Sequence, residues 1–153
     1  SVEKGEMMTD AAKKYFSFQT RADGGIKLRP DGEVLCRNAR IINSDIVPGA
    51  THLSFVHYVN PGLHDTPTHV HDVDEIVGFF GSDSENVDSL NGVMRFYIDG
   101  EWIEFNQSCF IFIPAGIEHC PYEIVSMEKP IMHISMLPTS RYGRDAGDAE
   151  NGQ

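Results

Sequence analysis

Short apolar runs separated by turn sequences recur along most of the chain, from about residue 26 to residue 138. The turns include Arg29-Pro30-Asp31-Gly32, Val47-Pro48-Gly49 and Asp99-Gly100. Short runs bounded by such residues are typical of β-strands, and Asp-Gly between two of them indicates a tight hairpin. Little helical periodicity interrupts the series. The pattern therefore predicts an all-β sandwich or barrel.

The same pattern places the individual strands. The expected strands are Ile26–Leu28, Glu33–Cys36, Arg40–Asn43, His52–Val59, Glu75–Phe80, Val93–Ile98, Trp102–Phe105, Cys109–Ile113, Pro121–Val125 and Ile131–Met136. The acidic, polar stretch Gly81–Gly92 is longer than an ordinary hairpin connection, so we expect a surface loop there.

The two ends of the chain differ in character from the middle. We expect residues 1–24 to be an N-terminal extension with one short helix, capped by Thr9 or Asp10. An aromatic cluster in this extension (Tyr15, Phe16 and Phe18) is a candidate for docking it on the body or on a second subunit. Residues 25–139 are predicted to form a single barrel, because no internal repeat is visible, and 140–153 a flexible polar tail.

The composition of the chain limits the kinds of binding partner that we expect. The chain has 153 residues and a formal net charge of −11, so we expect neither nucleic acid nor an anionic membrane as a partner, since both bind basic surfaces. No apolar run approaches the roughly 18 residues that cross a bilayer. The three cysteines, Cys36, Cys109 and Cys120, are scattered. This favours a reduced, cytoplasmic setting over a disulfide framework.

Candidate chemistry is concentrated in the segment 61–81. His69 and His71 are separated by one residue, so on a strand both imidazoles face the same side. Two such imidazoles can clamp a transition metal ion. Glu75 has the same odd parity, and a tight turn over residues 72–74 would return it to that side.

A second segment supplies a fourth group. Pro114 ends a predicted strand, Gly116 permits a turn, and His119 begins the next strand, where it can face inward. Three imidazoles and one carboxylate suit Fe(II), Mn(II), Ni(II), Cu(II) or Zn(II) better than Mg(II) or Ca(II). The sequence therefore predicts a divalent metal site, with Fe(II) favoured, built from His69, His71, Glu75 and His119.

These two segments resemble the two sequence motifs of the cupin superfamily. The first motif is carried by Gly62, His69, His71, Glu75 and Gly81, and the second by Pro114, Gly116 and His119. The resemblance spans roughly residues 50–138. It implies a cupin double-stranded β-helix, or jelly-roll barrel, in a small single-domain protein with the metal inside. It also implies a homodimer.

Two further histidines on predicted strands are candidates for lining the interior. His57 lies on the strand before the first motif, and His133 lies on the last strand. Either could serve as a base or a substrate contact. The opposite face of the last strand, with Met132, Ile134 and Met136, looks more like core, which favours an exposed His133.

Other polar residues are expected outside the site. His52 and His64 are predicted to be surface or loop residues. Arg95 is predicted to point outward, because its neighbours make the better core face. Strand alternation turns Cys120 away from the metal, so we expect it to be a small buried apolar residue.

The predicted site leads to a functional hypothesis with open alternatives. The favoured hypothesis is a mononuclear metal enzyme of the dioxygenase type that acts on a small organic substrate. Its candidate catalytic residues are Glu75, His57 and His133. A non-redox metal-dependent isomerase, decarboxylase or lyase is the main alternative. A non-catalytic binding or sensing module is the other, since a fold does not determine function.

Overall fold

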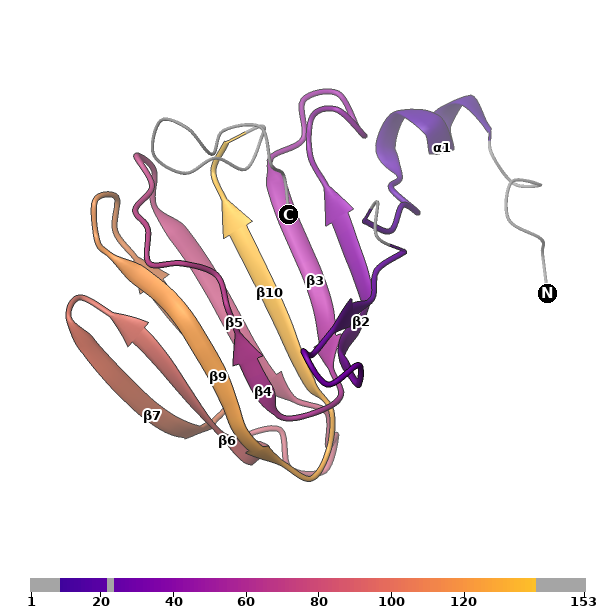
Figure 1. The fold of residues 1–153 in the computed structure, drawn as a ribbon. Helices are drawn as coiled ribbons and strands as arrows, with labels where there is room; N and C mark the ends of the chain where they lie inside the picture. The colour runs from indigo at the N-terminus through magenta and orange to yellow at the C-terminus, as the bar shows by residue number, and fades with distance from the viewer. Residues whose placement is uncertain (1–8, 22–23, 140–153) are drawn as a thin grey trace.

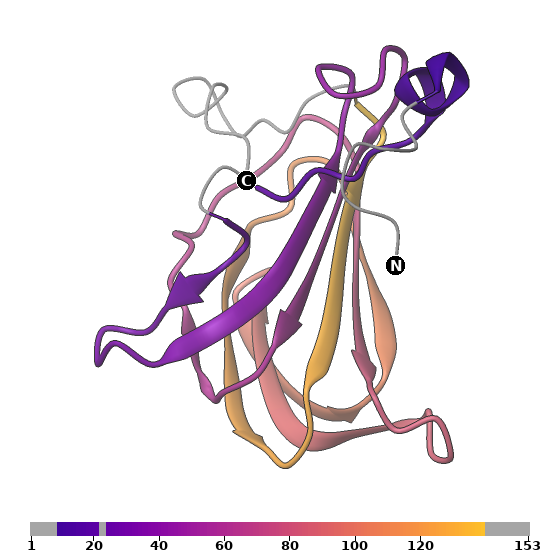
Figure 2. The same cartoon turned by 90° about the vertical axis from the view of Figure 1, so that its right-hand side faces the viewer.

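A computed structural model describes residues 9–21 and 24–139 as two antiparallel β-sheets that face each other (Figures 1 and 2). One sheet has the strand order β1-β2-β3-β10-β5-β8 and the other β4-β9-β6-β7. The predicted all-β, double-sheet jelly-roll fold is confirmed. The elements are α1 (Asp10–Tyr15), β1 (Lys27–Leu28), β2 (Val34–Ile42), β3 (His52–Tyr58), β4 (Gly62–His64), β5 (Glu75–Gly81), β6 (Ser89–Ile98), β7 (Glu101–Gln107), β8 (Cys109–Ile113), β9 (His119–Met127) and β10 (Ile131–Leu137).

The N-terminal segment begins with the helix that the sequence predicts. The Thr9 side chain accepts a hydrogen bond from the Ala12 N–H at 3.1 Å and caps α1, as Ser and Thr commonly do. The segment then runs beside β2, where Thr20 forms a bridge with Arg40 and the Ser17 hydroxyl donates to the Ile41 carbonyl. Hydrogen bonds therefore hold the N-terminal segment against β2. The aromatic cluster does not, because its three side chains are exposed. The tail predicted for 140–153 lies outside the described residues.

The core lies between the two sheets, where inward-facing side chains from both sheets meet. Phe79 of β5, Met94 and Phe96 of β6, and Ile124 of β9 are almost completely buried. Burial of such side chains stabilises the fold by about 1.5–3 kcal/mol each.

The face of β10 that looked like core is the outer one. Met132 and Met136 are only partly buried, whereas Ile131, His133 and Leu137 are buried between the sheets. The expectation of an exposed His133 was therefore wrong. The outer face is the more apolar one, because the inner face also carries His133 and Ser135, so alternation alone favours the wrong face.

Two connections differ from the expected ones. The predicted loop Gly81–Gly92 is shorter, because β6 already begins at Ser89. A Cβ on Gly81 would lie 1.8 Å from the Ser89 carbonyl oxygen, so this close passage of β5 past β6 requires glycine. The two expected strands around residues 33–43 form one strand, β2. Its register shifts between Arg37 and Arg40, where Asn38 has a φ of 59°.

No helix in the described part of the chain is long and apolar enough to cross a membrane.

Candidate metal centre

His69 and His71 lie in the extended segment between β4 and β5. His69 pairs with His119, and their N–H groups donate to each other's carbonyls at 3.1 Å. The His71 carbonyl accepts from the Gly116 N–H at 2.9 Å. The segment is thus attached to the second motif by backbone hydrogen bonds, although only the His69 bridge is strand-like, not the regular strand that the spacing predicts.

The three imidazoles meet in one place. The His69 and His119 ring centroids are 4.4 Å apart, those of His69 and His71 4.8 Å, and those of His71 and His119 5.1 Å. His71 and His119 are buried, and His69 is partly buried. The structure therefore brings together the three histidines that the motifs single out.

Glu75 joins this cluster from the first position of β5. The turn before it is fixed because the Asp74 carboxylate accepts from the Ala115 N–H at 3.0 Å. Glu75 Oε1 lies 3.1 Å from His119 Nε2 and 3.7 Å from His71 Nε2. Its other oxygen, Oε2, accepts from the Ser135 hydroxyl at 2.9 Å. The carboxylate is thus oriented on both sides, and the expected return of Glu75 to the histidines is observed.

Backbone carbonyls determine the tautomers of two imidazoles. His69 Nδ1 lies 2.7 Å from the Pro67 carbonyl oxygen, and His119 Nδ1 lies 2.9 Å from that of Ile117. Because a carbonyl oxygen only accepts, each Nδ1 carries the hydrogen. In the neutral ring Nε2 then carries a lone pair, the arrangement common among metal-binding histidines.

The contact between His119 and Glu75 requires a positive charge. A lone pair on His119 Nε2 facing a carboxylate oxygen at 3.1 Å would be repulsive unless a proton or a metal ion lies there. The donor atoms of His71, Glu75 and His119 lie within 4.8 Å of one another. Two donors on one ion are at most about 4.2 Å apart, so small side-chain movements would complete the site. The cluster fits a divalent metal ion, without indicating which one.

Electrostatics at Glu75 agree with this arrangement. Burial by itself raises the pKa of the Glu75 carboxyl, but neighbouring His119 and His71 and the Ser135 hydroxyl outweigh it and hold the pKa below its usual value. The carboxylate is therefore ionised at neutral pH and available as a ligand.

A small cavity of about 50 Å³ adjoins the cluster. Its far wall is aromatic and polar: the Tyr58 and Tyr122 hydroxyls hydrogen-bond to each other, and His64 stacks on Tyr122 with ring centroids 4.6 Å apart. The His64 Nδ1 contacts the Thr66 hydroxyl at 2.7 Å. Burial raises the pKa of both tyrosines and lowers that of His64 to about 3. All three groups are neutral at pH 7.

His133 also lines this cavity. It stacks on Phe79, with centroids 4.4 Å apart, and its Nδ1 lies 2.9 Å from the Gly78 carbonyl oxygen. Nδ1 therefore carries the hydrogen and Nε2 the lone pair. Burial lowers the pKa of His133 to about 4, so it is a neutral imidazole oriented by the sheet.

One candidate histidine lies outside the site, and the expectation for two others was wrong. His57 does not line the cavity, because it lies on the outer face of β3, where Nδ1 contacts Asn38 at 3.2 Å. His52 and His64, expected at the surface, are both buried. Alternation along β3 puts even-numbered residues inside, and no feature of the sequence near His64 marks it as an interior residue.

The expected direction of the Cys120 side chain was also wrong. Cys120 is buried, as predicted, but it lines the cavity instead of turning away from the cluster. The expected outward direction of Arg95 is confirmed: it is exposed, forms an ion pair with Glu123, and its guanidinium lies 4.5 Å from the centre of the Trp102 ring.

In this chain two facing antiparallel sheets enclose a cluster of histidines and a glutamate. No family model and no curated protein matches its sequence. Among solved structures it is similar to the polyketide cyclase RemF from Streptomyces resistomycificus, at 18% identity and a TM-score of 0.47, over 84% of this chain and 75% of that one.

Two further solved structures are similar to it. One is an RmlC-like cupin from Shewanella frigidimarina, at 13% identity and a TM-score of 0.44, over 82% of this chain and 91% of that one. The other is oxalate decarboxylase OxdC of Bacillus subtilis, in its S161A form, at 14% identity and a TM-score of 0.48, over 82% of this chain and 30% of that one. These similarities concern the double-sheet fold.

Proposed function

We propose that this chain is a mononuclear metal-dependent enzyme that acts on a small organic substrate, with its ion held by His69, His71, Glu75 and His119. The observation that carries the proposal is the contact of His119 Nε2 with Glu75 Oε1 at 3.1 Å inside the barrel. The backbone carbonyl on Nδ1 leaves Nε2 to bind a cation there.

We propose Fe(II) as the ion and dioxygenase chemistry as the reaction type. Three imidazoles and a carboxylate suit Fe(II), Mn(II), Ni(II), Cu(II) and Zn(II). Such an ion supplies a Lewis acid, and as Fe(II) also a centre that activates dioxygen. The protein's own residues do the rest: Ser135 orients Glu75, and the sheets exclude water around the cluster.

His133 is the proposed substrate contact. Its Nδ1–H is occupied by the Gly78 carbonyl, and burial keeps the ring neutral, so the Nε2 lone pair can accept a hydrogen bond from the substrate. Arg21 and Lys27 also line the cavity. Lys27 is paired with Asp65 at 3.0 Å, and the Arg21 guanidinium supports a substrate that bears a carboxylate or another anion.

The metal itself is tested first. Protein purified without a His tag is loaded with Fe(II) under anaerobic conditions, beside a His69→Ala/His71→Ala variant and a His57→Ala control from the outer face of β3. We expect about one ion per chain in the wild type and in the control, and almost none in the double variant. Equal, near-zero metal in all three would refute the proposal.

The reaction type is tested by admitting air to the Fe(II) protein with a panel of small carboxylates. Oxygen uptake that depends on a substrate is the expected result. The non-redox alternative, an isomerase, decarboxylase or lyase, is favoured by the neutral, oriented His133. It predicts turnover with Zn(II) or Mn(II) that is indifferent to oxygen. Thermal stabilisation by a ligand without turnover would instead support a binding or sensing module.

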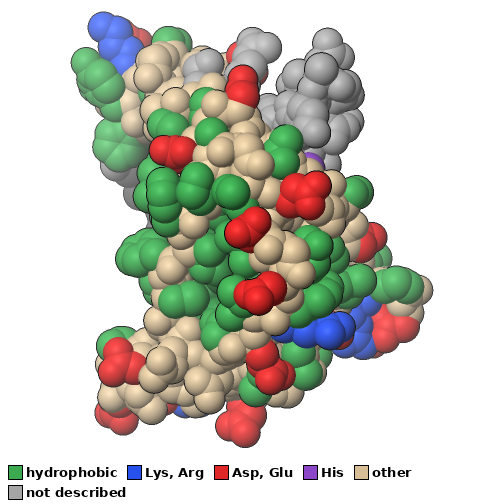
Figure 3. Space-filling view, turned by 90° about the vertical axis from the view of Figure 1, so that its left-hand side faces the viewer, with side chains coloured by type: hydrophobic (Ala, Val, Ile, Leu, Met, Phe, Trp, Pro, Cys, Tyr) green, Lys and Arg blue, Asp and Glu red, His purple; other side chains and the backbone are tan. Residues whose placement is uncertain are grey.

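We further propose a cytoplasmic homodimer. Support for the dimer comes from the outer face of the larger sheet, where Phe110 and Phe112 of the edge strand β8 are 68% and 59% exposed. Phe80 of β5 lies beside Phe110, with centroids 5.1 Å apart. Hydrophobic side chains are spread among acidic ones on the side of the molecule drawn in Figure 3. Light scattering of the wild type and a Phe110→Glu/Phe112→Glu variant tests this, with a monomeric variant expected.

A further inference from the structure

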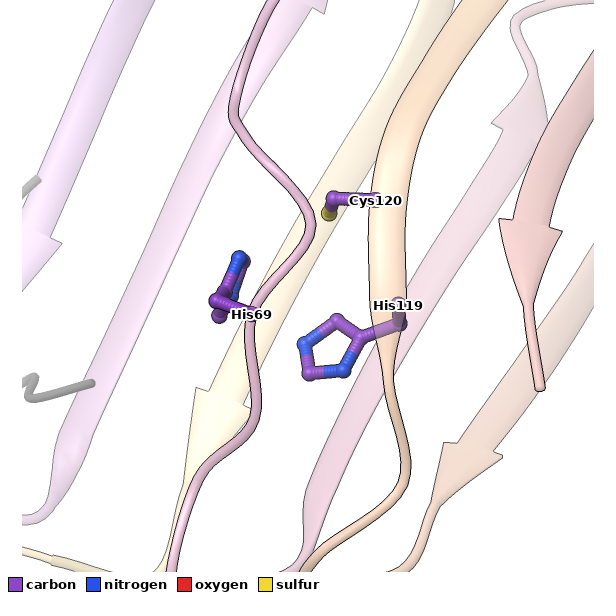
Figure 4. A group of neighbouring side chains, drawn as sticks. All are labelled: His69, His119 and Cys120. Carbon is purple, nitrogen blue, oxygen red and sulfur yellow. The ribbon is translucent and has the colours of Figure 1, made fainter. Parts of the chain in front are cut away.

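Cys120 lies beside the histidine cluster although strand alternation would turn it away. Figure 4 shows His119 and Cys120 projecting from neighbouring positions of β9 towards the segment that carries His69. The donor atoms of these three residues lie within 4.8 Å of one another. A thiol therefore accompanies the imidazoles at a position that neither the motifs nor the spacing assigns to the site.

An irregularity in β9 causes this placement. The register of β9 against β6 shifts between Phe96 and Ile98, which pair with Tyr122 and His119, so β9 contains one extra residue there. Such a bulge lets consecutive side chains face the same side. Cys120 has a φ of 71°, a region that residues other than glycine rarely adopt.

The bulge is held in place by its neighbours. The Thr68 hydroxyl donates to the Cys120 carbonyl at 2.7 Å, and the pairing of His69 with His119 follows immediately. His119 and Cys120 are 1% and 7% exposed. The local backbone thus presents an imidazole and a thiol to the same enclosed space.

We infer that the Cys120 thiolate is a further ligand of the ion, beside His69 and His119. The inference rests on the metal site proposed above. A thiolate bonds zinc at about 2.3 Å and an imidazole at about 2.1 Å, so two such donors on one ion lie at most about 4.4 Å apart. The donor atoms of His69, His119 and Cys120 all lie within 4.8 Å of one another, so small side-chain movements would bring them onto one ion. His119 belongs both to this group and to the group formed with His71 and Glu75, and its Nε2 is buried.

Thiolate ligation has a chemical consequence for the choice of metal. Binding releases the Cys120 proton to solvent, and the sulfur adds a soft donor to a set of nitrogens and a hard oxygen. Soft donors favour Zn(II) and copper over Mn(II). A Cys120 ligand would therefore select against Mn(II) at the site proposed above.

The test is a titration of the metal-free full chain with Co(II), followed by absorption spectroscopy. Visible ligand-field bands report that Co(II) is bound, and a near-ultraviolet sulfur-to-cobalt band reports a thiolate ligand. We expect both in the wild type. Cys120→Ser should keep the visible bands and lose the ultraviolet one, whereas Cys36→Ser, which alters another cysteine of the cavity, and Cys109→Ser should keep both.

The outcomes separate this inference from the proposed function. Visible bands without an ultraviolet band in the wild type, or an ultraviolet band that survives Cys120→Ser, would overturn the thiolate ligand and leave the metal site intact. Absence of visible bands in the wild type would overturn the metal site itself. Because Cys120→Ser could misfold, X-ray absorption on the wild-type Co(II) protein gives a second measurement. A sulfur neighbour at about 2.3 Å supports the inference, and only nitrogen and oxygen neighbours contradict it.

Discussion

The two ends of the cavity differ in how their polar side chains are paired. At the cluster end, the acceptor nitrogen of His119 faces the ionised carboxylate of Glu75 at 3.1 Å. At the far end each polar group has its own protein partner: Tyr58 bonds Tyr122, His64 contacts Thr66, and the Gly78 carbonyl accepts from a histidine.

This difference teaches where a ligand is needed. Buried polar groups are costly unless they are satisfied, so the cluster end is incomplete until a cation binds, whereas the far end is complete as it stands. The cluster is therefore suited to an ion. The far end is suited to shaping a substrate and accepting a hydrogen bond from it.

Removal of one group from each end should have the largest effect. We expect His119→Ala to weaken metal binding by more than about 100-fold, because even partners of a metal ligand contribute about 10–100-fold. His133→Asn, at the far end, should change metal affinity by less than about threefold. Equilibrium dialysis with metal analysis measures both. Equal losses in the two variants would mean that the ends are not distinct.

Stability of the metal-free protein should fall in acid. The pKa values of His64 and His133 are lowered by burial to about 3 and about 4, whereas both are near 6.5 in the unfolded chain. Between pH 6.5 and 4 the unfolded state thus binds more protons, and stability decreases as the pH falls. Each histidine should remove about 2 kcal/mol between pH 7 and pH 5.

Urea unfolding at pH 7, 6 and 5 measures this dependence. A His64→Asn/His133→Asn variant is the matched comparison, because it lacks both titrating groups of the far end. Between pH 7 and pH 5, the unfolding free energy of this variant should fall by about 4 kcal/mol less than that of the wild type. If the variant and the wild type lost stability equally, the two imidazoles would not be held neutral in the fold.

The tyrosine pair tests whether the far end is self-sufficient. Tyr122→Phe leaves the buried Tyr58 hydroxyl without its partner, which should cost about 1–3 kcal/mol of unfolding free energy. Tyr58→Phe/Tyr122→Phe should cost clearly less than the sum of the two single changes. Tyr97→Phe, outside the cavity, is the control. Additive costs in urea unfolding would show that the two hydroxyls do not depend on each other.

The smallest effect is expected from a residue that touches a ligand but not the ion. Ser135→Ala removes the hydrogen bond to Glu75 Oε2 and should weaken metal binding by roughly tenfold. Ser54→Ala alters another cavity-lining serine and should leave the affinity unchanged. Competition with a chelator of known affinity measures the difference. An unchanged affinity in Ser135→Ala would mean that Glu75 needs no orienting partner.

The cluster end could be predicted because its residues follow local rules. The parity of His69, His71 and Glu75, and the proline–glycine turn before His119, bring these side chains to one side with little help from the rest of the fold. The far end could not be predicted. His64 and His133 become interior residues only through the register of their strands against distant partners, and the face opposite His133 is apolar too.

The sequence by itself determined the double-sheet β fold, most strand positions and the four-residue cluster, since each depends on alternation, turn residues and spacings within a few positions. The tertiary structure decided which face of β10 is inside, that His57 points out, and that Cys120 points in. The physical reason is that these orientations depend on pairing between strands far apart in the sequence. The bulge of β9 against β6, for instance, reverses the direction that simple alternation assigns to Cys120.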